Sequence, residues 1–259
     1  MLGAIIGDIV GSRFEFDNTF DYDFVLFTKD CDFTDDTICT IAVADAILKG
    51  EDYKNSVLRW CRKYPYPKGA YGSSFIQWIH SENPHPYGSF GNGAAMRVSP
   101  VGWAFKEECA VIREAMNTAK ISHSHTEGLI GASATALGIL YLRKEPSSDW
   151  VAEDIMIRHY GKDWESDLIP QGHFDETCQG CVPLSFHLVK EAHSFEDAIR
   201  KAVSYGGDSD TVGAIVGSLA EARFGLDEGM AKKALEYLPE DMREVVRLFK
   251  ERHYLCAKA

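Results

Sequence analysis

Residues 206–225 have the sequence GGDSDTVGAIVGSLAEARFG, in which an acidic motif leads into a predicted helix. Apolar residues recur with a period near 3.6 and predict a helix from Asp210 to Phe224, which Gly225 ends. The residues at 213, 214, 217 and 220 are glycine or alanine, so the backbone of another helix can approach closely. The stretch therefore predicts a tightly packed helix that begins beside two carboxylates.

Segments of the same periodicity extend over most of the chain. Residues 38–48 predict a helix that ends at Gly50, and residues 126–143 predict a long apolar helix at the centre. Another helix begins at Ser194, whose sequence neighbours have the spacing of a capping box, and extends to the glycines at 206–207. Helices thus account for most of the regular structure that we expect.

The remaining segments are short or irregular. Residues 24–27 are the best candidate for a strand, and residues 64–100 and 161–184 are rich in Gly, Pro, Ser, Asn and His, which is typical of functional or disordered loops. Two more helices fill the C-terminal part, one with Pro239 at its first position. A chain of 259 residues without repeats or linkers predicts one all-α domain over residues 1–259.

The charge of the chain limits the class of ligand. There are 39 acidic and 27 basic side chains, for a net charge of −12. Such a surface repels nucleic acids and anionic lipid headgroups, so neither is expected as a partner. If the ligand is itself anionic, bound divalent cations would have to attract it.

The N-terminal sequence and the cysteines indicate a cytoplasmic protein. Residues 1–8, MLGAIIGD, have no basic region before the apolar run, and no apolar stretch reaches the ~20 residues of a membrane span. The seven cysteines are an odd number and predict reduced thiols. Cys178 and Cys181 have CxxC spacing but lack both nearby zinc ligands and a strand-turn-helix redox context. The cysteines are Cys31, Cys39, Cys61, Cys109, Cys178, Cys181 and Cys256.

Two similar acidic motifs are the strongest chemical signal. Residues 34–37 are TDDT and residues 208–211 are DSDT, and each motif lies at the beginning of a predicted helix. One interpretation is helix capping, since Asp and Thr are good N-caps and the helix dipole favours carboxylates there. The other is a metal site, since carboxylates and hydroxyls without His or Cys favour Mg²⁺ or Mn²⁺. Two such ions about 3.5–4 Å apart would neutralise four carboxylates. Spacing alone leaves both interpretations open.

Five motifs in the same order resemble the ADP-ribosylglycohydrolase family, which includes dinitrogenase-reductase-activating glycohydrolases and serine- and arginine-directed (ADP-ribosyl)hydrolases. They are GDIVGSRFE at 7–15, FTDDT at 33–37, GSFGNGAAMRV at 88–98, Ser122-His123, and GGDSDT at 206–211. The resemblance covers almost the whole chain. It implies a compact orthogonal bundle of helices with a binuclear metal cleft.

The resemblance also implies roles for single residues. The metal ligands would be Thr34, Asp35, Asp36, Asp208, Asp210 and Thr211, which would hold two Mg²⁺ or Mn²⁺ ions. Glu15 matches an acid that lies on a flexible loop over the metals in the serine-directed branch. Either Glu15 or Asp36 would accept and donate the proton during catalysis. The alternative for Glu15 is an exposed loop acid like its neighbours Asp17, Asp21 and Asp23.

The predicted substrate contacts are Ser89, Phe90, Gly91, Asn92, Gly93 and His123. A glycine-rich backbone can approach a diphosphate closely, although a tight turn at residues 92–93 would explain the same glycines. His123 matches a ligand-contacting histidine of the serine-directed branch, and its alternative is a surface or helix-start position. Residues 178–183 resemble the substrate-loop region of the family, and we assign them no catalytic role.

These residues together predict a metal-dependent hydrolase that cleaves the glycosidic bond at the distal ribose of ADP-ribose. The ADP-ribose would be carried by a protein side chain or a small molecule. The resemblance implies that arginine-directed bacterial relatives use an acid from the central region, and this chain has none between Asp52 and Glu82. Together with Glu15 and the segment at 88–93, which resemble the serine-directed branch, this favours O-linked or α-configured substrates over arginine-linked ones. Two alternatives are a non-catalytic ADP-ribose-binding or structural member of the family, and a two-metal phosphatase. A phosphatase needs a basic cluster, and only Arg13 and Arg97 lie within the motifs.

Overall fold

The computed structural model describes residues 1–146 and 150–254, and every regular element within these ranges is a helix. In chain order these are α1 (Leu2–Gly11), α2 (Asp35–Lys49), α3 (Tyr53–Lys63), α4 (Ser73–His80), α5 (Gly93–Met96), α6 (Ser99–Ala104), α7 (Glu108–Lys120), α8 (Thr126–Lys144), α9 (Trp150–Tyr160), α10 (Cys178–Lys190), α11 (Phe195–Tyr205), α12 (Ser209–Phe224), α13 (Glu228–Tyr237) and α14 (Glu240–His253). The prediction of an all-α fold is confirmed.

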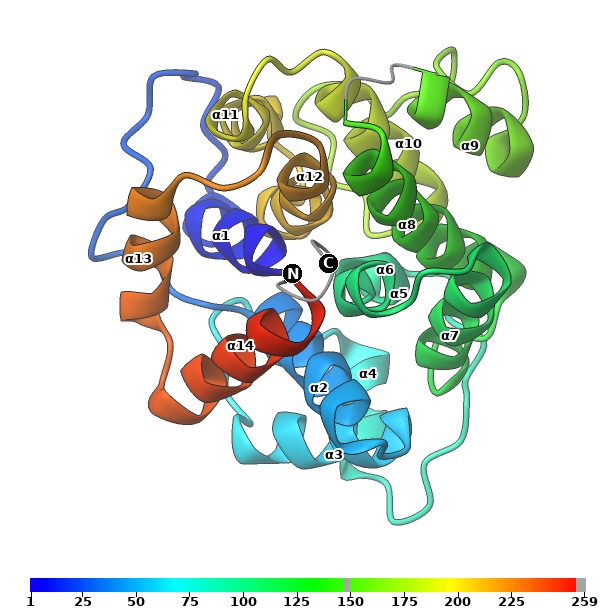
Figure 1. Cartoon of the computed structure of the whole chain (residues 1–259). Coiled ribbons are helices and arrows are strands. Elements are labelled where there is room, and N and C mark those ends of the chain that lie inside the picture. Colours follow the sequence, from blue (N-terminus) through cyan, green and yellow to red (C-terminus); the bar gives the residue numbers. More distant parts are fainter. Residues whose placement is uncertain (147–149, 255–259) are drawn as a thin grey trace.

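Helices α1 and α12 lie side by side with their backbones in contact (Figure 1). The positions that face each other are Gly3 with Gly217, Gly7 with Gly213, and Gly11 with Ser209. The two helices are therefore antiparallel, and the C-terminal end of α1 lies at the N-terminal end of α12. A Cβ atom on Gly7 would lie 1.9 Å from the carbonyl oxygen of Gly213, so this packing requires glycine. The close approach expected from the small residues of α12 is confirmed.

The other predicted helices are found close to their expected positions. α8 is the long apolar helix, and most of its residues from 131 to 142 are buried. α2 ends at Gly50, which adopts the left-handed conformation at φ 64°. The side chain of Ser194 accepts a hydrogen bond from the backbone N–H of Asp197 at 3.1 Å, which caps α11 as expected. Pro239 was misplaced by one residue, because it is the N-cap and α14 begins at Glu240.

The predicted strand at residues 24–27 is wrong. This segment is irregular, and its backbone carbonyls are satisfied by side chains: Arg200 donates to Phe24 and Arg13 donates to Val25. The ring of Phe24 packs edge-on against Phe14 with 5.3 Å between the ring centroids. With these partners the segment needs no neighbouring strand.

Both stretches predicted as irregular contain helices. Residues 64–100 include α4, α5 and the beginning of α6, and residues 161–184 include the first turns of α10. α4 is only eight residues long, and α10 begins with a CxxC sequence and contains Pro183, so neither has a pattern that distinguishes it from a loop. α1 was also not predicted, because it is buried on all sides and has no polar face.

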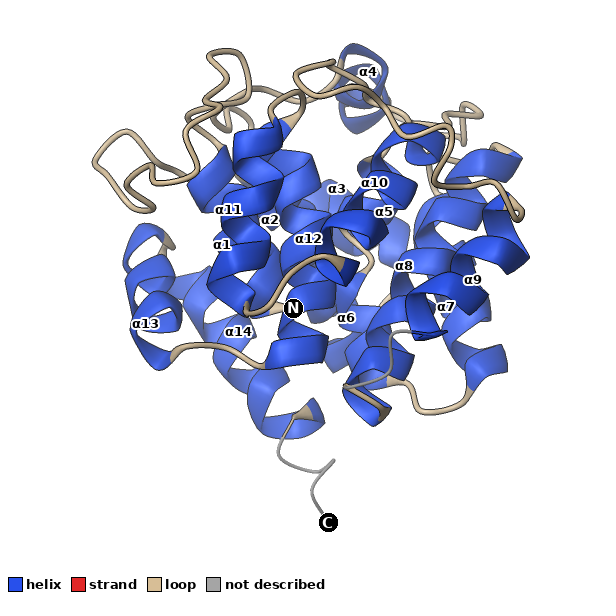
Figure 2. Cartoon of the chain, turned by 90° about the horizontal axis from the view of Figure 1, so that it is seen from above, coloured by secondary structure: helices blue, strands red, loops and turns tan. Residues whose placement is uncertain are grey.

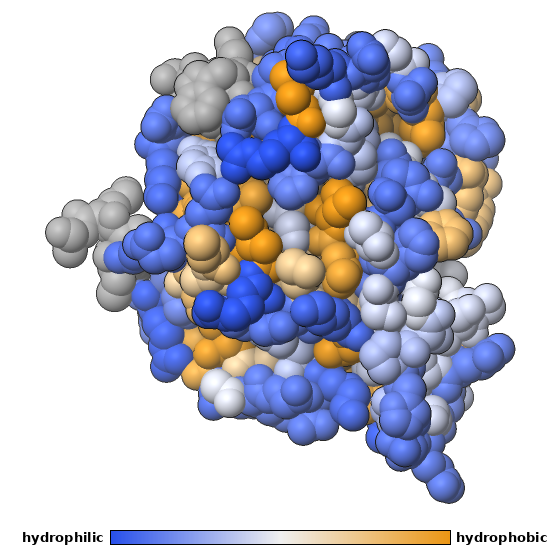
Figure 3. Space-filling view, turned by 90° about the vertical axis from the view of Figure 1, so that its right-hand side faces the viewer, coloured by the Kyte–Doolittle hydropathy of each residue, from blue (hydrophilic) through white to orange (hydrophobic). Residues whose placement is uncertain are grey.

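Long loops gather at one end of the helices together with α4 (Figure 2). A different face, which lies to the right in Figure 1, is mostly hydrophilic with apolar side chains in a band between the polar ones (Figure 3).

No helix of the described ranges is long and apolar enough to cross a membrane. The described cysteines are free thiols, and Cys256 lies outside the described residues. A single domain over residues 1–259 stays a prediction.

The contact between α1 and α12 can be tested with Gly7→Ala. The added methyl group meets backbone atoms that cannot move independently, so we expect a loss of roughly 3 kcal/mol in the free energy of unfolding. Urea denaturation measures this loss. Gly72→Ala is the matched control, since its Cβ has no neighbour within 4 Å, and it should change stability by less than about 0.5 kcal/mol. Equal stability of the two variants would contradict the packing.

Candidate active site

Five acidic side chains converge where α1, α2 and α12 meet. Oxygen atoms of Asp8, Asp36 and Asp210 lie within 4.8 Å of one another, and so do oxygens of Glu15, Asp208 and Asp210. Because Asp210 belongs to both groups, the two sets of oxygens are adjacent. All of these residues except Glu15 are buried.

Asp8 connects α1 to the beginning of α2. Its carboxylate accepts hydrogen bonds from the backbone N–H groups of Thr34 at 3.0 Å and Thr37 at 3.1 Å, and from both threonine hydroxyls. It therefore satisfies free N–H groups at the N-terminus of α2, where the helix dipole also favours a negative charge. Thr34 in turn accepts the N–H of Asp36 at 3.2 Å, which caps α2. Capping and clustering of acids thus occur together at this helix end.

The central carboxylates have oxygens without partners. Oδ1 of Asp36 and Oδ1 of Asp210 are buried and accept no hydrogen bond within the described chain. The other Asp36 oxygen accepts from Thr211 at 3.2 Å, which joins α12 to α2. Burial, followed by the neighbouring carboxylates, raises the pKa of Asp36 and of Asp210 well above the usual range. Unpaired buried oxygens in a set of hard oxygen donors fit a divalent cation such as Mg²⁺ or Mn²⁺.

Glu15 lies on the loop after α1, and Asn18 attaches this loop to residues 206–207. The Asn18 amide donates to the carbonyl oxygens of Phe14 at 2.6 Å and Gly207 at 2.9 Å, and its oxygen accepts the N–H of Gly207 at 2.8 Å. Glu15 is half-buried, and burial, followed by the charge of Asp208, raises its pKa to about 7. Its neighbour Asp17 is exposed. The alternative of an exposed loop acid is therefore wrong for Glu15.

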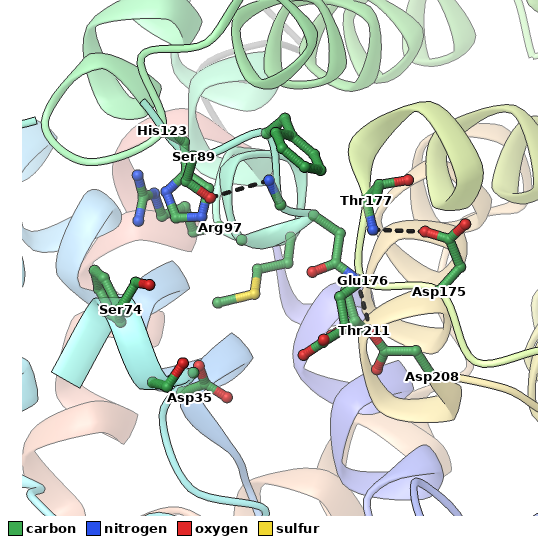
Figure 4. A pocket seen from close by; sticks show the side chains of 18 of the residues that line it. Asp35, Ser74, Ser89, Arg97, His123, Asp175, Glu176, Thr177, Asp208 and Thr211 are labelled. Carbon is green, nitrogen blue, oxygen red and sulfur yellow. Dashed lines mark hydrogen bonds between the residues drawn. The ribbon is translucent and has the colours of Figure 1, made fainter. Parts of the chain in front are cut away.

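A cavity of about 660 Å³ opens above these acids. Asp35 lies on one side of it and Asp208 with Thr211 on the other, while Ser89, Arg97 and His123 lie together along another edge (Figure 4). Of the residues predicted for the site, the lining includes Glu15, Asp35, Ser89, Phe90, Gly91, Asn92, Gly93, His123, Asp208, Asp210 and Thr211. Thr34 and Asp36 are buried and do not line the cavity. The volume suits a ligand of nucleotide size.

The glycine-rich segment at 88–93 forms one wall of the cavity. Asn92 holds it in place, since its backbone N–H donates to the carbonyl of Glu176 at 2.7 Å and its amide donates to Asp208 at 2.6 Å. The thiol of Cys178 donates to the carbonyl of Gly91 at 3.1 Å. The chain does turn at residues 92–93, where the N–H of Ala94 donates to the carbonyl of Gly91 at 3.3 Å, and this turn leads directly into α5. The tight-turn alternative is therefore found in the structure together with the cavity wall.

His123 is buried against this wall with 6% of its surface exposed. A Cβ atom on Gly93 would lie 2.8 Å from His123 Nε2, so the glycine makes room for the imidazole ring. Burial, followed by the charge of Arg97, lowers the pKa of His123 well below its usual value. The helix-start position belongs instead to His125, whose Nδ1 accepts the N–H of Glu127 at 3.2 Å. The surface and helix-start alternatives for His123 are both wrong.

The comparison with known families agrees with this arrangement. The model of the family described as ADP-ribosylglycohydrolase matches residues 1–257. The chain belongs to the ADP-ribosylglycohydrolase family. The family predicted from the five motifs is thereby confirmed.

Several relatives support the general class of activity. ADP-ribosylhydrolase ARH3 of Danio rerio is 24% identical over 88% of this chain and 82% of its own length. The human ARH3 protein is 23% identical over 88% and 85% of the two chains. ADP-ribosyl-[dinitrogen reductase] glycohydrolase of Rhodospirillum rubrum is 26% identical over 75% and 70%. A solved structure described as an ADP-ribosylglycohydrolase-related protein complex covers 97% of this chain with a TM-score of 0.74 at 19% identity, which shows the shared fold.

Some residues of this ADP-ribosylglycohydrolase site were not predicted. Asp8 is part of a quoted motif, but an acid within an apolar run gave no sign that it would bind the start of α2. Glu176 lines the cavity and its charge contributes to the raised pKa of Glu15, yet it lies in an irregular stretch without a pattern. Arg97 was weighed only as a phosphate ligand, whereas it is completely buried beside His123.

The acid cluster makes the stability of the metal-free protein depend on pH. Burial raises the pKa of Asp8 to about 6, and that of Glu15 is about 7, compared with about 4 in an unfolded chain. Since the folded state binds these protons more tightly, their stabilising contribution is complete below about pH 4 and is lost as the pH rises through 6 to 7. In EDTA, we therefore expect a higher melting temperature at pH 5.5 than at pH 8, measured by calorimetry.

Added Mg²⁺ should reverse this loss, because a bound cation replaces the protons. We expect a larger rise in melting temperature at pH 8 than at pH 5.5, and no rise in Asp210→Asn. Asp45→Asn is the matched control, because Asp45 pairs with Lys49 and Arg59 away from the cluster and should leave the response to Mg²⁺ intact. If Mg²⁺ raises the melting temperature of Asp210→Asn as much as that of wild type, the cation binds elsewhere.

Proposed function

We propose that this protein hydrolyses the glycosidic bond at the distal ribose of ADP-ribose and releases ADP-ribose from a modified side chain or small molecule. The observation that carries the proposal is the cluster of buried carboxylates with unpaired oxygens at the floor of a cavity of about 660 Å³. Family membership supports this class of activity in general. The metal dependence, the linkage and the roles of single residues are proposals.

The metal-binding residues in this proposal are Thr34, Asp35, Asp36, Asp208, Asp210 and Thr211. Asp8 would support them from below, because it orients Thr34 and Thr37 at the start of α2. Two bound Mg²⁺ or Mn²⁺ ions would supply Lewis-acid polarisation and attract an anionic ligand into an acidic protein. The positive charge of the cations would then offset the repulsion among the carboxylates.

The cavity wall would place the ligand. The backbone of residues 89–93 would approach the diphosphate, and Phe90, with 46% of its surface exposed, would contribute packing with its ring. His123 lies beside this segment and also lines the cavity. These contacts would leave the distal ribose at the acid cluster, where Glu15 and Asp35 line the cavity from different chain segments.

Glu15 is the better candidate of the two proposed proton carriers. Hydrolysis of a glycosidic bond passes through an oxocarbenium-like transition state, in which a carboxyl group activates water or protonates the leaving group. Glu15 lines the cavity and is only half-buried, so its carboxyl group can reach a bound ligand. Asp36 is 1% exposed, and one of its oxygens is already bonded to Thr34 and Thr211. Asp36 would therefore hold metal, while Glu15 moves the proton.

We favour an O-linked or α-configured substrate over an arginine-linked one. Glu15 lines the cavity from the early loop, whereas the lining residues from the central region, Ala70 and residues 72–75, include no acidic side chain. The alternative is a non-catalytic ADP-ribose-binding or structural member of the family. ADP-ribose, or a protein or small molecule that carries it, is the proposed partner in either case, and a cytoplasmic location stays a prediction.

The proposal is tested by release of free ADP-ribose from serine- and arginine-modified peptides, O-acetyl-ADP-ribose and α-NAD, with Mg²⁺ or with EDTA. We expect release from at least one substrate that requires the cation and is abolished in Asp35→Ala and Asp210→Ala. Binding of ADP-ribose without release from any substrate would favour the non-catalytic alternative. If the protein neither binds ADP-ribose nor releases it from any substrate, the proposed function is refuted.

The role of Glu15 has its own prediction. Glu15→Gln keeps the size of the side chain but cannot carry the proton, so kcat should fall by about 10²- to 10⁴-fold with little change in KM. Asp17→Asn is the matched control, since it changes an exposed acid of the same loop, and it should keep wild-type kcat. If the two variants have similar kcat values, a group other than Glu15 transfers the proton during catalysis.

A further inference from the structure

A buried guanidinium lies behind His123. Arg97 is fully buried and forms no ion pair with a carboxylate of the described chain. Its Nη2 donates to the carbonyl of Thr118 and to Oγ of Ser122, both at 2.9 Å, while Nε and Nη1 have no hydrogen-bond partner there. Ser122 thus connects Arg97 to the imidazole, and Arg97 and His123 lie next to each other at the cavity edge (Figure 4).

The directions of the hydrogen bonds between Arg97, Ser122 and His123 follow from the protons that each group can donate. A guanidinium only donates, so Ser122 Oγ is an acceptor toward Arg97. Oγ of Ser122 also lies 2.8 Å from Nδ1 of His123, and the hydroxyl has no other partner in the described chain. If Nδ1 carried a proton, the fully buried Ser122 hydroxyl would have no acceptor for its own proton. The satisfied arrangement has Ser122 donating to an unprotonated Nδ1.

The second ring nitrogen lies at the edge of the cavity, which His123 helps to line. Nε2 of His123 has no hydrogen-bond partner within the described residues, and it lies beside the backbone at Gly91 and Gly93. The rings of Phe75 and Tyr87 flank the imidazole at centroid distances of 6.3 and 6.0 Å. Burial and the nearby guanidinium both disfavour the imidazolium form. A neutral ring with an unprotonated Nδ1 must carry its proton on Nε2.

We propose that Arg97 and Ser122 are positioning residues that hold His123 as the Nε2–H tautomer, so that the wall of residues 89–93 presents a neutral N–H donor to a phosphate oxygen of the ligand. The identity of the ligand rests on the proposed function, whereas the tautomer does not. The site thereby gains a donor of fixed direction that keeps its proton as the pH changes near neutrality.

Nitrogen-15 NMR of histidine-labelled protein tests the tautomer without any ligand. The His123 signals are assigned by their loss in His123→Ala. At neutral pH we expect a protonated Nε2 and an unprotonated Nδ1 in wild type and in Ser122→Thr, and a changed pattern in Ser122→Ala. Ser133→Ala removes another buried hydroxyl, which bonds only to the carbonyl of Leu129, and should leave the pattern unchanged. A protonated Nδ1 in wild type, or the wild-type pattern in Ser122→Ala, would overturn the proposal.

Calorimetric titration with ADP-ribose then tests the function of the donor. Loss of a hydrogen bond to a charged oxygen should weaken the Kd about tenfold or more in His123→Ala and, to a smaller extent, in Ser122→Ala. In the double variant, Ser122→Ala should add no further loss, because its effect passes through His123. If the losses of affinity in the two single variants add up in the double variant, Ser122 does not act through His123 and the proposal is overturned. If wild type shows the expected tautomer but binds no ADP-ribose, the positioning role stands and the proposed function fails.

Discussion

The site depends on the backbone contact between α1 and α12. Because Gly7 and Gly213 lack side chains, the two helices touch along their backbones, and their antiparallel register is fixed by atoms that cannot rearrange. This register carries the end of α1 to the start of α12. It thereby places Asp8 and Glu15, which precede and follow the end of α1, beside Asp210. Substitutions at these glycines should therefore affect the site as well as stability.

A second constraint is the charge of the cluster. Asp8 has partners without a cation, because its carboxylate accepts four hydrogen bonds from the beginning of α2, although burial still raises its pKa to about 6. Asp36 and Asp210 each have an oxygen with no such partner. Burial of unpaired carboxylates is costly, so these two residues need either protons or cations. This difference separates a carboxylate that supports the fold from those that we propose as metal ligands.

Local signals made part of this arrangement predictable. The two acidic motifs and the period of α12 depend on neighbouring residues, and both are found in the structure near the positions that the pattern indicated. Asp8, Arg97 and Glu176 act through residues distant in the chain, so their surroundings arise only on folding. The strand prediction at 24–27 was wrong for the same reason: a short run of aromatic and branched apolar residues suits a strand, but the partners of its backbone are the side chains of distant arginines.

We propose above all that Asp210 and the carboxylates around it would hold two divalent cations at the floor of the cavity. Anomalous diffraction from crystals grown with Mn²⁺ and ADP-ribose tests it most directly, because it locates the ions without assuming a function. We expect two peaks, both within coordination distance of Asp210, with the distal ribose of the ligand above them. A cluster without a peak, or ADP-ribose bound away from these carboxylates, would contradict the account.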